Sequence, residues 1–408
     1  MKINGERLLQ NLRKLRTFGA TENGVVRQTL SPVDMASREW IQARMVEAGL
    51  TTHMDGVSNI FGCSPNDGPA LLIGSHSDTQ PRGGWLDGAL GVMYGLEIAR
   101  AAREDKSTAD LAIDAVSLAD EEGTFLGCLG SRSLTGTLTP EMEQAAVNAD
   151  GVSLAQALLD TGLSERPRTR LDAERYAGYL EAHIEQGPYL EEASNQIGVV
   201  TSIVGIRGCV LHFQGQQNHA GTTPMARRQD AGVTLFEFAT ELRKRFMSLA
   251  DERTVWTIGR VTLLPGAPSI IPGQAEMQIQ FRDQSVERLD AMWAVLESLL
   301  GETNAAGGVQ VRMQSVRSPI VPTHMDDRFQ EHIAAAAERH SPGRWMRMLS
   351  AAGHDPMYLS HHLPCAMVFI PSIDGISHDF AEDSHDEDIV AGCQVMADAA
   401  EAILRARS

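Results

Sequence analysis

The sequence predicts an α/β fold: a mostly parallel sheet with helices on both faces, with a smaller α+β domain inserted into it. Three observations support this prediction. A composition of 43% hydrophobic and 22% charged residues over 408 positions is typical of a folded chain with two or three domains. Apolar runs alternate with amphipathic segments in the first half of the chain and again near its end. Between residues 207 and 320 the order of elements changes.

Helices and buried strands alternate in the first half of the chain. A helix that begins near Ser31 or Asp34 ends at Gly49, because serine and aspartate cap helix N-termini and glycine ends helices. A second helix covers residues 88–104. Short apolar runs predict strands at 70–76, 111–119, 179–187 and 366–373. Strands and helices that alternate in this way form largely parallel sheets covered on both faces.

The segment 207–320 has the order β-α-β-β-α-β. Strands are predicted at 209–215, 253–264, 275–283 and 309–316, and helices at 230–250 and 285–300. This order is that of ferredoxin-like domains. We therefore predict an α/β domain formed by residues 1–206 and 321–408, and an inserted ferredoxin-like domain formed by residues 207–320.

The charge and cysteine content argue against several classes of protein. The 35 Lys and Arg against 53 Asp and Glu leave a net charge of −18, which argues against nucleic acid or an anionic membrane surface as a partner. No apolar run reaches the roughly 18 residues that span a bilayer. The five cysteines form no C-x-x-C pair, so we expect neither a disulfide framework nor a Cys-rich zinc site, and we expect a cytoplasmic location.

Polar residues follow the predicted strands of the α/β domain at their carboxyl ends. These residues are His76, Asp78, Asp87, Glu121, Glu122, His183 and His378. Ligands of open α/β sheets bind at this edge, so these side chains could converge there. Imidazoles and carboxylates in this mixture suit two divalent ions, Zn or Mn with Co or Ni as alternatives, better than they suit Mg or Ca. On composition alone, His385 is a rival to His378.

Six strings, in order between positions 74 and 383, resemble one enzyme family. They are GSHSDTQPRGGWLDGALGV (74–92), DEEG (120–123), AHIEQGPYLE (182–191), NHAGTTPMARRQDA (218–231), AAGHDPM (351–357) and PSIDGISHDFAED (371–383). The chain resembles the dinuclear-metal amidohydrolases of the M20 peptidase superfamily, in the hydantoinase/carbamoylase amidase branch. That branch contains N-carbamoyl-L-amino-acid hydrolases, β-ureidopropionases, and allantoate and ureidoglycolate amidohydrolases.

The resemblance implies a role for each candidate metal ligand. His76 and His183 would hold one ion, Glu122 and His378 would hold the other, and Asp87 would bridge both. The matching string GISH contains His378, which makes it the expected ligand in preference to the later histidine. The resemblance therefore implies two divalent ions per subunit.

The resemblance also implies which residues act on the substrate. Glu121 would be the general base that takes a proton from a water between the ions and returns it to the leaving nitrogen. His219 would stabilise the oxyanion from across a dimer interface formed by the inserted domain. Asp78 would orient His76 through its distal nitrogen. The implied substrate contacts are Gln186, Ser269, Arg282, Gly353 and His354, with Arg282 holding the substrate carboxylate.

Two loops depart from the pattern of the branch. Ser269 stands where the branch has an Asn that contacts the substrate. Ala351 and Pro356 stand where the branch has Gly and Ala. A hydroxyl reaches less far than an amide, and a methyl group removes conformations open only to glycine. We therefore expect the substrate to differ from those of other members of the branch, while the hydrolytic chemistry stays the same.

We expect a metal-dependent amidohydrolase that cleaves the ureido C–N bond of an N-carbamoyl amino acid or a related ureido acid, and that forms a homodimer. Allantoate and ureidoglycolate are alternative substrates. An aminoacylase or dipeptidase on the same site is a second alternative, although peptidase relatives usually carry an acidic ligand at the position of His183. A catalytically silent binding protein is a third, and the complete ligand set and Glu121 argue against it.

Overall fold

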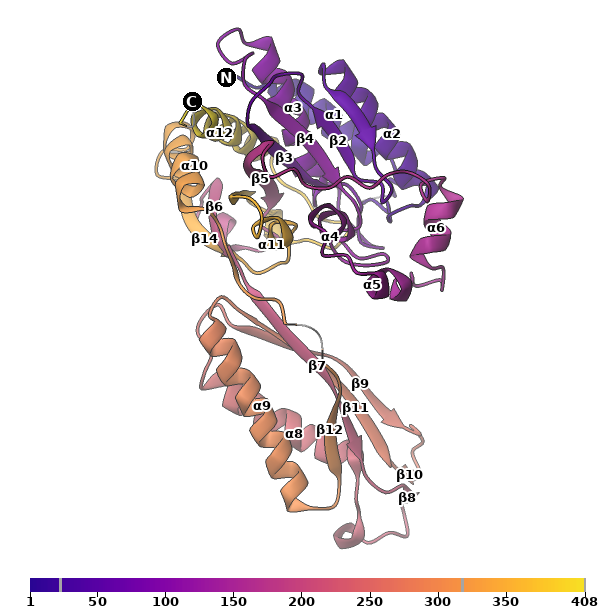
Figure 1. Cartoon of the computed structure of the whole chain (residues 1–408). Coiled ribbons are helices and arrows are strands. Elements are labelled where there is room, and N and C mark those ends of the chain that lie inside the picture. Colours follow the sequence, from indigo (N-terminus) through magenta and orange to yellow (C-terminus); the bar gives the residue numbers. More distant parts are fainter. Residues whose placement is uncertain (22–23, 317–318, 407–408) are drawn as a thin grey trace. The chain divides into compact units, whose positions relative to one another are not determined.

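The computed structural model describes residues 1–21, 24–316 and 319–406, which divide into two units (Figure 1). Unit 1 consists of Met1–Ser202 and His324–Ser408, and unit 2 consists of Ile203–Thr323. Each unit has its own cluster of buried hydrophobic residues. Each unit is therefore described by itself.

A mostly parallel sheet forms the centre of unit 1. Among the described residues it has nine strands, in the order β1-β2-β4-β3-β5-β15-β6-β13, with β14 paired to β6. The four central strands, β4, β3, β5 and β15, run parallel, and β2 and β6 flank them in antiparallel orientation. The strands are β1 (Thr51–Met54), β2 (Ile60–Cys63), β3 (Ala70–His76), β4 (Ile113–Leu118), β5 (Tyr176–Ile184), β6 (Ile197–Ile203), β13 (Thr323–His324), β14 (Trp345–Ser350) and β15 (Cys365–Ile370).

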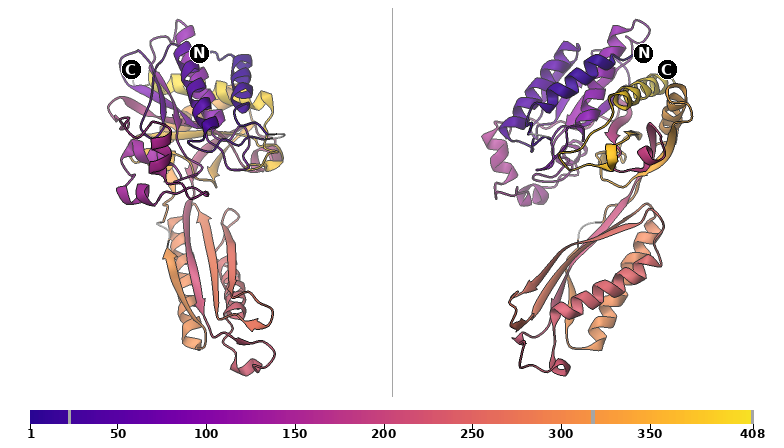
Figure 2. Two further views of the ribbon diagram at one scale, coloured as in Figure 1. Left: turned by 90° about the vertical axis from the view of Figure 1, so that its right-hand side faces the viewer. Right: turned by 180° about the vertical axis from the view of Figure 1, so that it is seen from behind.

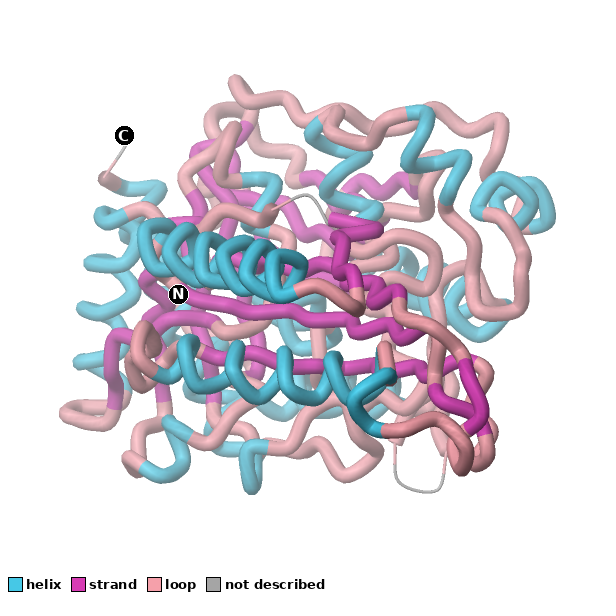
Figure 3. The backbone as a smooth tube through the Cα atoms, turned by 90° about the horizontal axis from the view of Figure 1, so that it is seen from below, coloured by secondary structure: helices cyan, strands magenta, loops and turns pink. Residues whose placement is uncertain are grey.

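Helices cover this sheet. Helices α1, α3, α10 and α12 pack against one another, and α3 and α12 lie against the central strands, whereas α2 packs on β1 and β2. The helices of unit 1 are α1 (Gly5–Arg16), α2 (Pro32–Glu47), α3 (Ala89–Glu104), α4 (Leu129–Thr135), α5 (Pro140–Ala145), α6 (Leu154–Asp160), α7 (Tyr189–Glu192), α10 (Asp327–His340), α11 (Pro356–Leu359) and α12 (Asp386–Arg405), with a 3₁₀ turn, η2 (Ile373–Gly375). Figure 3 colours the helices and strands by type.

Unit 2 is an antiparallel sheet with two long helices packed on it (Figure 2). Its strand order, β12-β7-β11-β9, and its chain order, β-α-β-β-α-β, are those of a ferredoxin-like fold. A short pair, β8 and β10, extends from it. The elements are β7 (Gly205–Gln214), β8 (Asn218–His219), η1 (Met225–Arg227), α8 (Ala231–Met247), β9 (Val255–Leu264), β10 (Ile270–Ile271), β11 (Gln274–Asp283), α9 (Val286–Ala306) and β12 (Gln310–Val316).

Local signals explain where several elements begin and end. Ser31 caps α2, because its side chain accepts a hydrogen bond from the backbone N–H of Asp34. Asp34 itself lies inside the helix, so its prediction as an alternative cap is wrong. The strand predicted to run to residue 373 ends at Ile370, directly before Pro371. Among the described residues, no helix combines the length and apolar character needed to cross a membrane.

Candidate metal centre and active site

The candidate site lies where four parallel strands of unit 1 end. The candidate ligands at this edge are Glu122 after β4, His76 at the end of β3, His183 in β5 and His378 after β15, and the candidate base Glu121 directly precedes Glu122. Asp87 joins them from the loop between β3 and α3. Because β4, β3, β5 and β15 are neighbours in the sheet, residues more than 300 positions apart meet at one place.

His76, His183 and Asp87 form the first group that could hold an ion. The Oδ1 atom of Asp87 lies 3.0 Å from His183 Nε2 and 3.3 Å from His76 Nε2. All three side chains are buried. The two imidazoles and one carboxylate oxygen therefore converge in the interior of unit 1.

Asp87, Glu122 and His378 form the second group. The other oxygen of Asp87, Oδ2, lies 3.2 Å from His378 Nε2, which is in turn 3.5 Å from Glu122 Oε2. Each oxygen of Asp87 thus faces one group, which is the arrangement of a carboxylate that bridges two ions. His378, and not His385, belongs to this group.

The donor geometry fits divalent transition-metal ions. A tetrahedral ion with bonds of about 2.0–2.2 Å separates its ligand atoms by about 3.3–3.5 Å, close to the separations found here. The buried Nε2 atom of His76 makes no hydrogen bond to any described residue, and a bond to an ion would satisfy it. The mixed imidazole and carboxylate donors suit Zn, Mn, Co or Ni.

Backbone carbonyls orient both buried imidazoles. The Nδ1 atom of His76 lies 3.1 Å from the carbonyl oxygen of Asp78, and that of His183 lies 2.9 Å from the carbonyl oxygen of Ile184. A proton on each Nδ1 would leave each Nε2 atom, which faces Asp87, as the nitrogen able to bind an ion. The side chain of Asp78 is farther away, with Oδ1 3.7 Å from His76 Nδ1. Asp78 therefore orients His76 mainly through its backbone oxygen.

The ligands attract one another strongly when they carry no ion. Burial opposes the charged form of His76 and His183, but Asp87 beside them raises the pKa of both imidazoles. The hydrogen bond with Asp87 raises the pKa of His378 to about 9. Burial also opposes ionisation of Asp87, yet the surrounding imidazoles hold its pKa well below the ordinary value. An ion that binds here must displace these protons.

Glu121 lies beside the ligands without belonging to either group. Its Oε2 atom is 3.7 Å from His76 Nε2, and the thiol of Cys128 donates to its Oε1 atom over 3.6 Å. Burial raises the pKa of Glu121 well above the ordinary value, so the carboxylate accepts a proton more readily than a solvent-exposed one does. A carboxylate of this kind, adjacent to the ions, suits a general base that later acts as an acid.

The loop after β4 is built to present Glu121 and Glu122. Asp120 has a positive φ of 55°, and its carboxylate accepts hydrogen bonds from three successive backbone N–H groups, those of residues 124–126. Glu122 accepts a hydrogen bond of 2.7 Å from the side chain of Gln80. Sequence reasoning missed Gln80, although it lies inside the first matching string.

The loop that carries Asp87 is held by Glu382, which sequence reasoning also missed. One oxygen of Glu382 accepts the backbone N–H groups of Leu86 and Asp87, and the other accepts the hydroxyl of Ser377. Gly88 follows with a φ of 63°, and a Cβ there would lie 2.4 Å from the His76 ring. Only glycine allows the chain to turn this closely behind the imidazole. Glu382 lies in the last matching string, which was the signal for it.

Two of the expected substrate contacts lie against the ligands. The side-chain amide of Gln186 donates 2.9 Å to Asp87 Oδ2 and lies 3.3 Å from His378 Nε2. The ring of His354 is buried and meets His183 edge-on at 4.6 Å between centroids, and burial lowers its pKa well below the ordinary value. Gly353 directly precedes it, and a Cβ on Gly353 would lie 2.9 Å from Met357. In this structure these residues therefore contact the ligands or pack beside them.

The other expected contacts belong to unit 2. The Nδ1 atom of His219 accepts hydrogen bonds from the backbone N–H groups of Gly221 and Thr222, at 3.0 and 3.1 Å. In the neutral ring the proton therefore sits on Nε2, which makes the exposed His219 a hydrogen-bond donor. Ser269 lies beside it, because its carbonyl accepts from Ala220 and Ile270 pairs with His219.

Arg282 lies at the other end of unit 2. It is the ninth residue of β11, whose first residue, Gln274, is at the end that carries β8 and β10. At about 3.3 Å per residue, roughly 25 Å of strand separates Arg282 from the end with His219 and Ser269. Within one copy of unit 2, these residues cannot contact one small substrate together.

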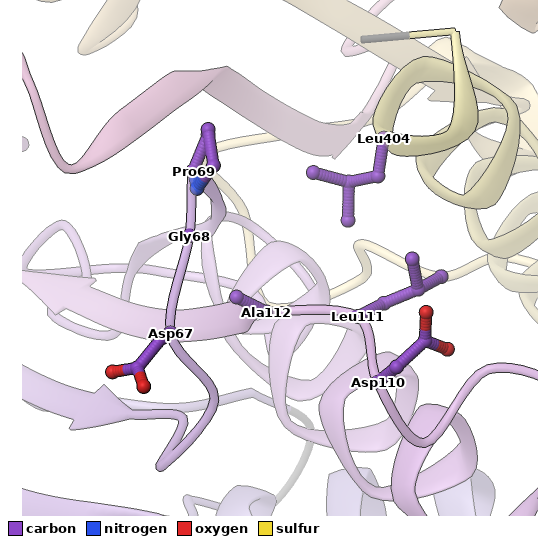
Figure 4. A pocket seen from close by; sticks show the side chains of 7 residues that line it. All are labelled: Asp67, Gly68, Pro69, Asp110, Leu111, Ala112 and Leu404. Atoms are coloured by element: carbon purple, nitrogen blue, oxygen red, sulfur yellow. The ribbon is translucent and has the colours of Figure 1, made fainter. Parts of the chain in front are cut away.

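A cavity of about 270 Å³ lies away from this site, at the amino ends of β3 and β4 (Figure 4). It is lined by Asp67, Gly68, Pro69, Asp110, Leu111, Ala112 and Leu404. None of the candidate ligands lines it. The candidate ligands at the carboxyl edge of the sheet therefore lie apart from this cavity.

Comparison with known proteins agrees with the resemblance of the six strings. Residues 72–402 match the peptidase family M20/M25/M40. The chain is 34% identical to an N-carbamoyl-L-amino-acid amidohydrolase of Paenarthrobacter aurescens, over 97% of each chain. It is 30% identical to a ureidoglycolate hydrolase of Arabidopsis thaliana, over 97% of this chain and 86% of that one. The crystal structure of a hydantoinase/carbamoylase family amidase from Burkholderia phymatum is 49% identical, with a TM-score of 0.92 over 100% of this chain and 99% of that one. The chain therefore belongs to the peptidase family M20/M25/M40, among the amidases of the hydantoinase/carbamoylase family.

Proposed function

We propose that this protein is an amidohydrolase that cleaves the ureido C–N bond of an N-carbamoyl amino acid or a related ureido acid. The observation that carries the proposal is the pair of ligand groups that share Asp87, with Glu121 beside them. Unit 1 is then the catalytic domain. The relatives whose names specify ureido substrates support the choice of bond.

His76, His183 and Asp87 would hold one divalent ion, and Asp87, Glu122 and His378 the second. We propose Zn or Mn as these ions, with Co or Ni as alternatives, on the basis of the donor atoms. When bound, the ions supply Lewis-acid polarisation of the ureido carbonyl and lower the pKa of a coordinated water.

The residues of the chain then move the protons. Glu121 takes a proton from the attacking water and delivers it to the leaving nitrogen. His219, with its proton on Nε2, donates a hydrogen bond to the oxyanion that forms on the attacked carbonyl. The products are ammonia, carbon dioxide and the amino acid. Arg282 is proposed to hold the substrate carboxylate, with further contacts from Gln186, Ser269, Gly353 and His354.

We propose a homodimer in which unit 2 serves as dimerisation and lid domain. The separation of His219 from Arg282 supports this proposal. One copy of unit 2 cannot bring both residues to one small substrate, whereas two copies can each supply one of them. The strand β9 lies at the edge of its sheet, and the neighbouring helix α8 contacts it through the Phe246 and Trp256 rings. The exposed large apolar side chains of β9 and α8 are Val233, Phe236, Met247, Val255, Val261 and Leu264. Such an edge suits pairing with a second copy.

The reaction is tested by ammonia release after the enzyme is stripped of metal and reloaded with Mn²⁺, Zn²⁺, Co²⁺ or Ni²⁺. The panel contains several N-carbamoyl-L-amino acids, β-ureidopropionate, allantoate and ureidoglycolate, with N-acetyl amino acids and a dipeptide alongside. Metal-dependent ammonia from a ureido compound is the expected result. Turnover of only the acyl or peptide compounds would contradict the proposal and assign the protein to the aminoacylases or dipeptidases.

The supply of His219 by a second copy is tested by complementation. Glu121→Gln and His219→Ala are each expected to be inactive when purified alone. When the two are coexpressed with different tags and the mixed dimer is isolated, one intact site can form if His219 acts from the partner, and activity returns to a sizeable fraction of the wild type. A mixed dimer as inactive as its parents would contradict a role for His219 across the interface.

We also propose a cytoplasmic location, which the free state of all five cysteines supports.

A further inference from the structure

A chain of buried charges connects helix α2 with the candidate metal centre. Asp34 and Arg38 lie one helical turn apart on α2, and both side chains have no exposed surface. The Nε atom of Arg38 donates to both oxygens of Asp34, at 3.0 and 2.9 Å, and its Nη1 atom donates 2.9 Å to the carbonyl of Ser58. These bonds fix the guanidinium in one orientation.

The remaining terminal nitrogen of Arg38 faces Asp78. Its Nη2 atom lies 3.9 Å from Asp78 Oδ1, and neither atom makes a hydrogen bond to any described residue. Both groups are fully buried. Because a guanidinium stays charged in proteins, Arg38 places a fixed positive charge beside the buried carboxyl group of Asp78.

Asp78 in turn touches both halves of the candidate metal centre. Its backbone oxygen and Oδ1 atom lie 3.1 and 3.7 Å from His76 Nδ1. Its Oδ2 atom accepts the backbone N–H of Glu122 at 3.3 Å. A shift of this one residue therefore moves a ligand of each ion.

A second buried arginine holds the main chain on either side of Asp78. Arg27 donates 2.6 Å from Nε to the carbonyl of Ser77, and its backbone exchanges hydrogen bonds with Thr79. Because the backbone is held at residues 77 and 79, only the side chain of Asp78 remains able to change its conformation. The guanidinium of Arg38 restricts that side chain.

We propose that Arg38, anchored by Asp34, is a positioning residue of the metal centre, which acts through the side chain of Asp78, chiefly on Glu122. The inference rests on the proposed function, since it presupposes that the two ligand groups bind ions. Partners that orient metal ligands typically change metal affinity by about 10- to 100-fold when they are mutated. We therefore expect Arg38→Met to weaken Mn²⁺ binding at least tenfold.

The test measures the dissociation constants of both Mn²⁺ ions, by chelator competition and calorimetry, in a double-mutant cycle. The variants are Arg38→Met, Asp78→Asn and the double variant, with Arg38→Lys to restore the charge. Arg175→Met is the matched control, because Arg175 pairs at 3.0 Å with the buried Asp114 elsewhere in the same sheet. Circular dichroism and the melting temperature verify that each variant folds.

If Arg38 acts through Asp78, its replacement weakens binding in the wild-type background but by less than about threefold when Asp78 is already Asn. Arg38→Lys recovers part of the affinity, and Arg175→Met binds like the wild type. Equal losses in both backgrounds, or an affinity unchanged in Arg38→Met, would overturn the inference. A wild type that binds no Mn²⁺ would instead contradict the proposed function.

A second variant covers the case in which Arg38→Met does not fold. Asp34→Asn is isosteric, keeps Arg38, and removes the anchor that orients its guanidinium. We expect it to weaken Mn²⁺ binding severalfold in the wild-type background and to have no further effect with Asp78→Asn. A folded Asp34→Asn with wild-type affinity would contradict the role of Asp34 as the anchor.

Discussion

The two halves of the candidate metal centre share Asp87 but differ in how they are built. In the His183 half-site (His76, His183 and Asp87 Oδ1) both imidazoles are only 1% exposed. In the His378 half-site (Asp87 Oδ2, Glu122 and His378) the imidazole is 49% exposed. The two imidazoles of the His183 half-site lie on neighbouring strands, β3 and β5. In the His378 half-site, Glu122 and His378 lie on the loops after β4 and β15.

This difference separates a preformed half-site from an adjustable one. Backbone carbonyls hold the rings of His76 and His183 in place. His378 has a positive φ of 54° on a loop, and the amide of Gln186 lies 3.3 Å from its Nε2 atom, where a ligand bond to an ion would form. An ion entering the His378 half-site must displace this contact. We therefore expect the His183 half-site to bind its ion more tightly.

The largest effect is expected from Glu121→Gln, which removes the base while both half-sites remain. Turnover should fall by about 10²- to 10⁴-fold, because general acid–base groups contribute that much. Both ions should still bind, as measured by metal analysis of the dialysed protein. Glu174→Gln, an exposed position, is the control. Near-normal turnover of Glu121→Gln with two ions bound would refute the assignment of the base.

Removal of one imidazole from each half-site tests the comparison itself. Stepwise titration of the metal-free protein should resolve a tight and a weak Mn²⁺ ion in the wild type. His378→Ala should lose the weak ion and keep the tight one, whereas His183→Ala should lose the tight ion. We expect the two wild-type dissociation constants to differ at least tenfold. Two equal sites, or loss of the tight ion in His378→Ala, would reverse the order proposed for the half-sites.

The stability of the metal-free protein should depend on pH. The pKa of His378 is raised to about 9, and burial raises that of Glu122 and of Glu382 to about 7. Each group binds its proton more tightly in the folded state, so its stabilising effect is complete below its unfolded pKa and is lost as the pH rises through its folded pKa. The melting temperature of the metal-free protein should therefore fall between pH 5 and 9.

Bound ions should flatten this dependence, because they replace the protons as the countercharge of Asp87. Differential scanning fluorimetry with and without Mn²⁺ measures both curves. Parallel curves, with the same loss of melting temperature from pH 5 to 9, would show that the ions do not bind at these titrating groups.

The smallest effect is expected from Cys128, whose thiol donates to Glu121 Oε1. Cys128→Ala should lower turnover by about two- to fivefold, as expected for one modest hydrogen bond, and Cys128→Ser should lower it less. Cys63→Ala, far along the sheet on β2, serves as the control. A loss of 100-fold or more in Cys128→Ala would mean that the thiol does more than orient the base.

The sequence allowed the candidate ligands to be predicted because each directly follows or ends a strand or lies in a matching string. The order of elements in unit 2 could be predicted for the same local reasons. The contacts that hold the site in place could not be predicted, because they arise only on packing. Glu382 reaches Asp87 from nearly 300 positions away, and Arg38 on α2 reaches Asp78 in the loop after β3. The distance between His219 and Arg282 likewise depends on where each lies along the sheet.

We expect ureido hydrolysis to require an ion in each of the two half-sites. To test this, Mn²⁺ is added stepwise to the metal-free wild type while ammonia release from the best ureido substrate and the number of bound ions are measured together. Little activity is expected while the first equivalent fills the His183 half-site, and activity should rise as the second equivalent binds. Full activity at one equivalent, or none at two, would contradict it.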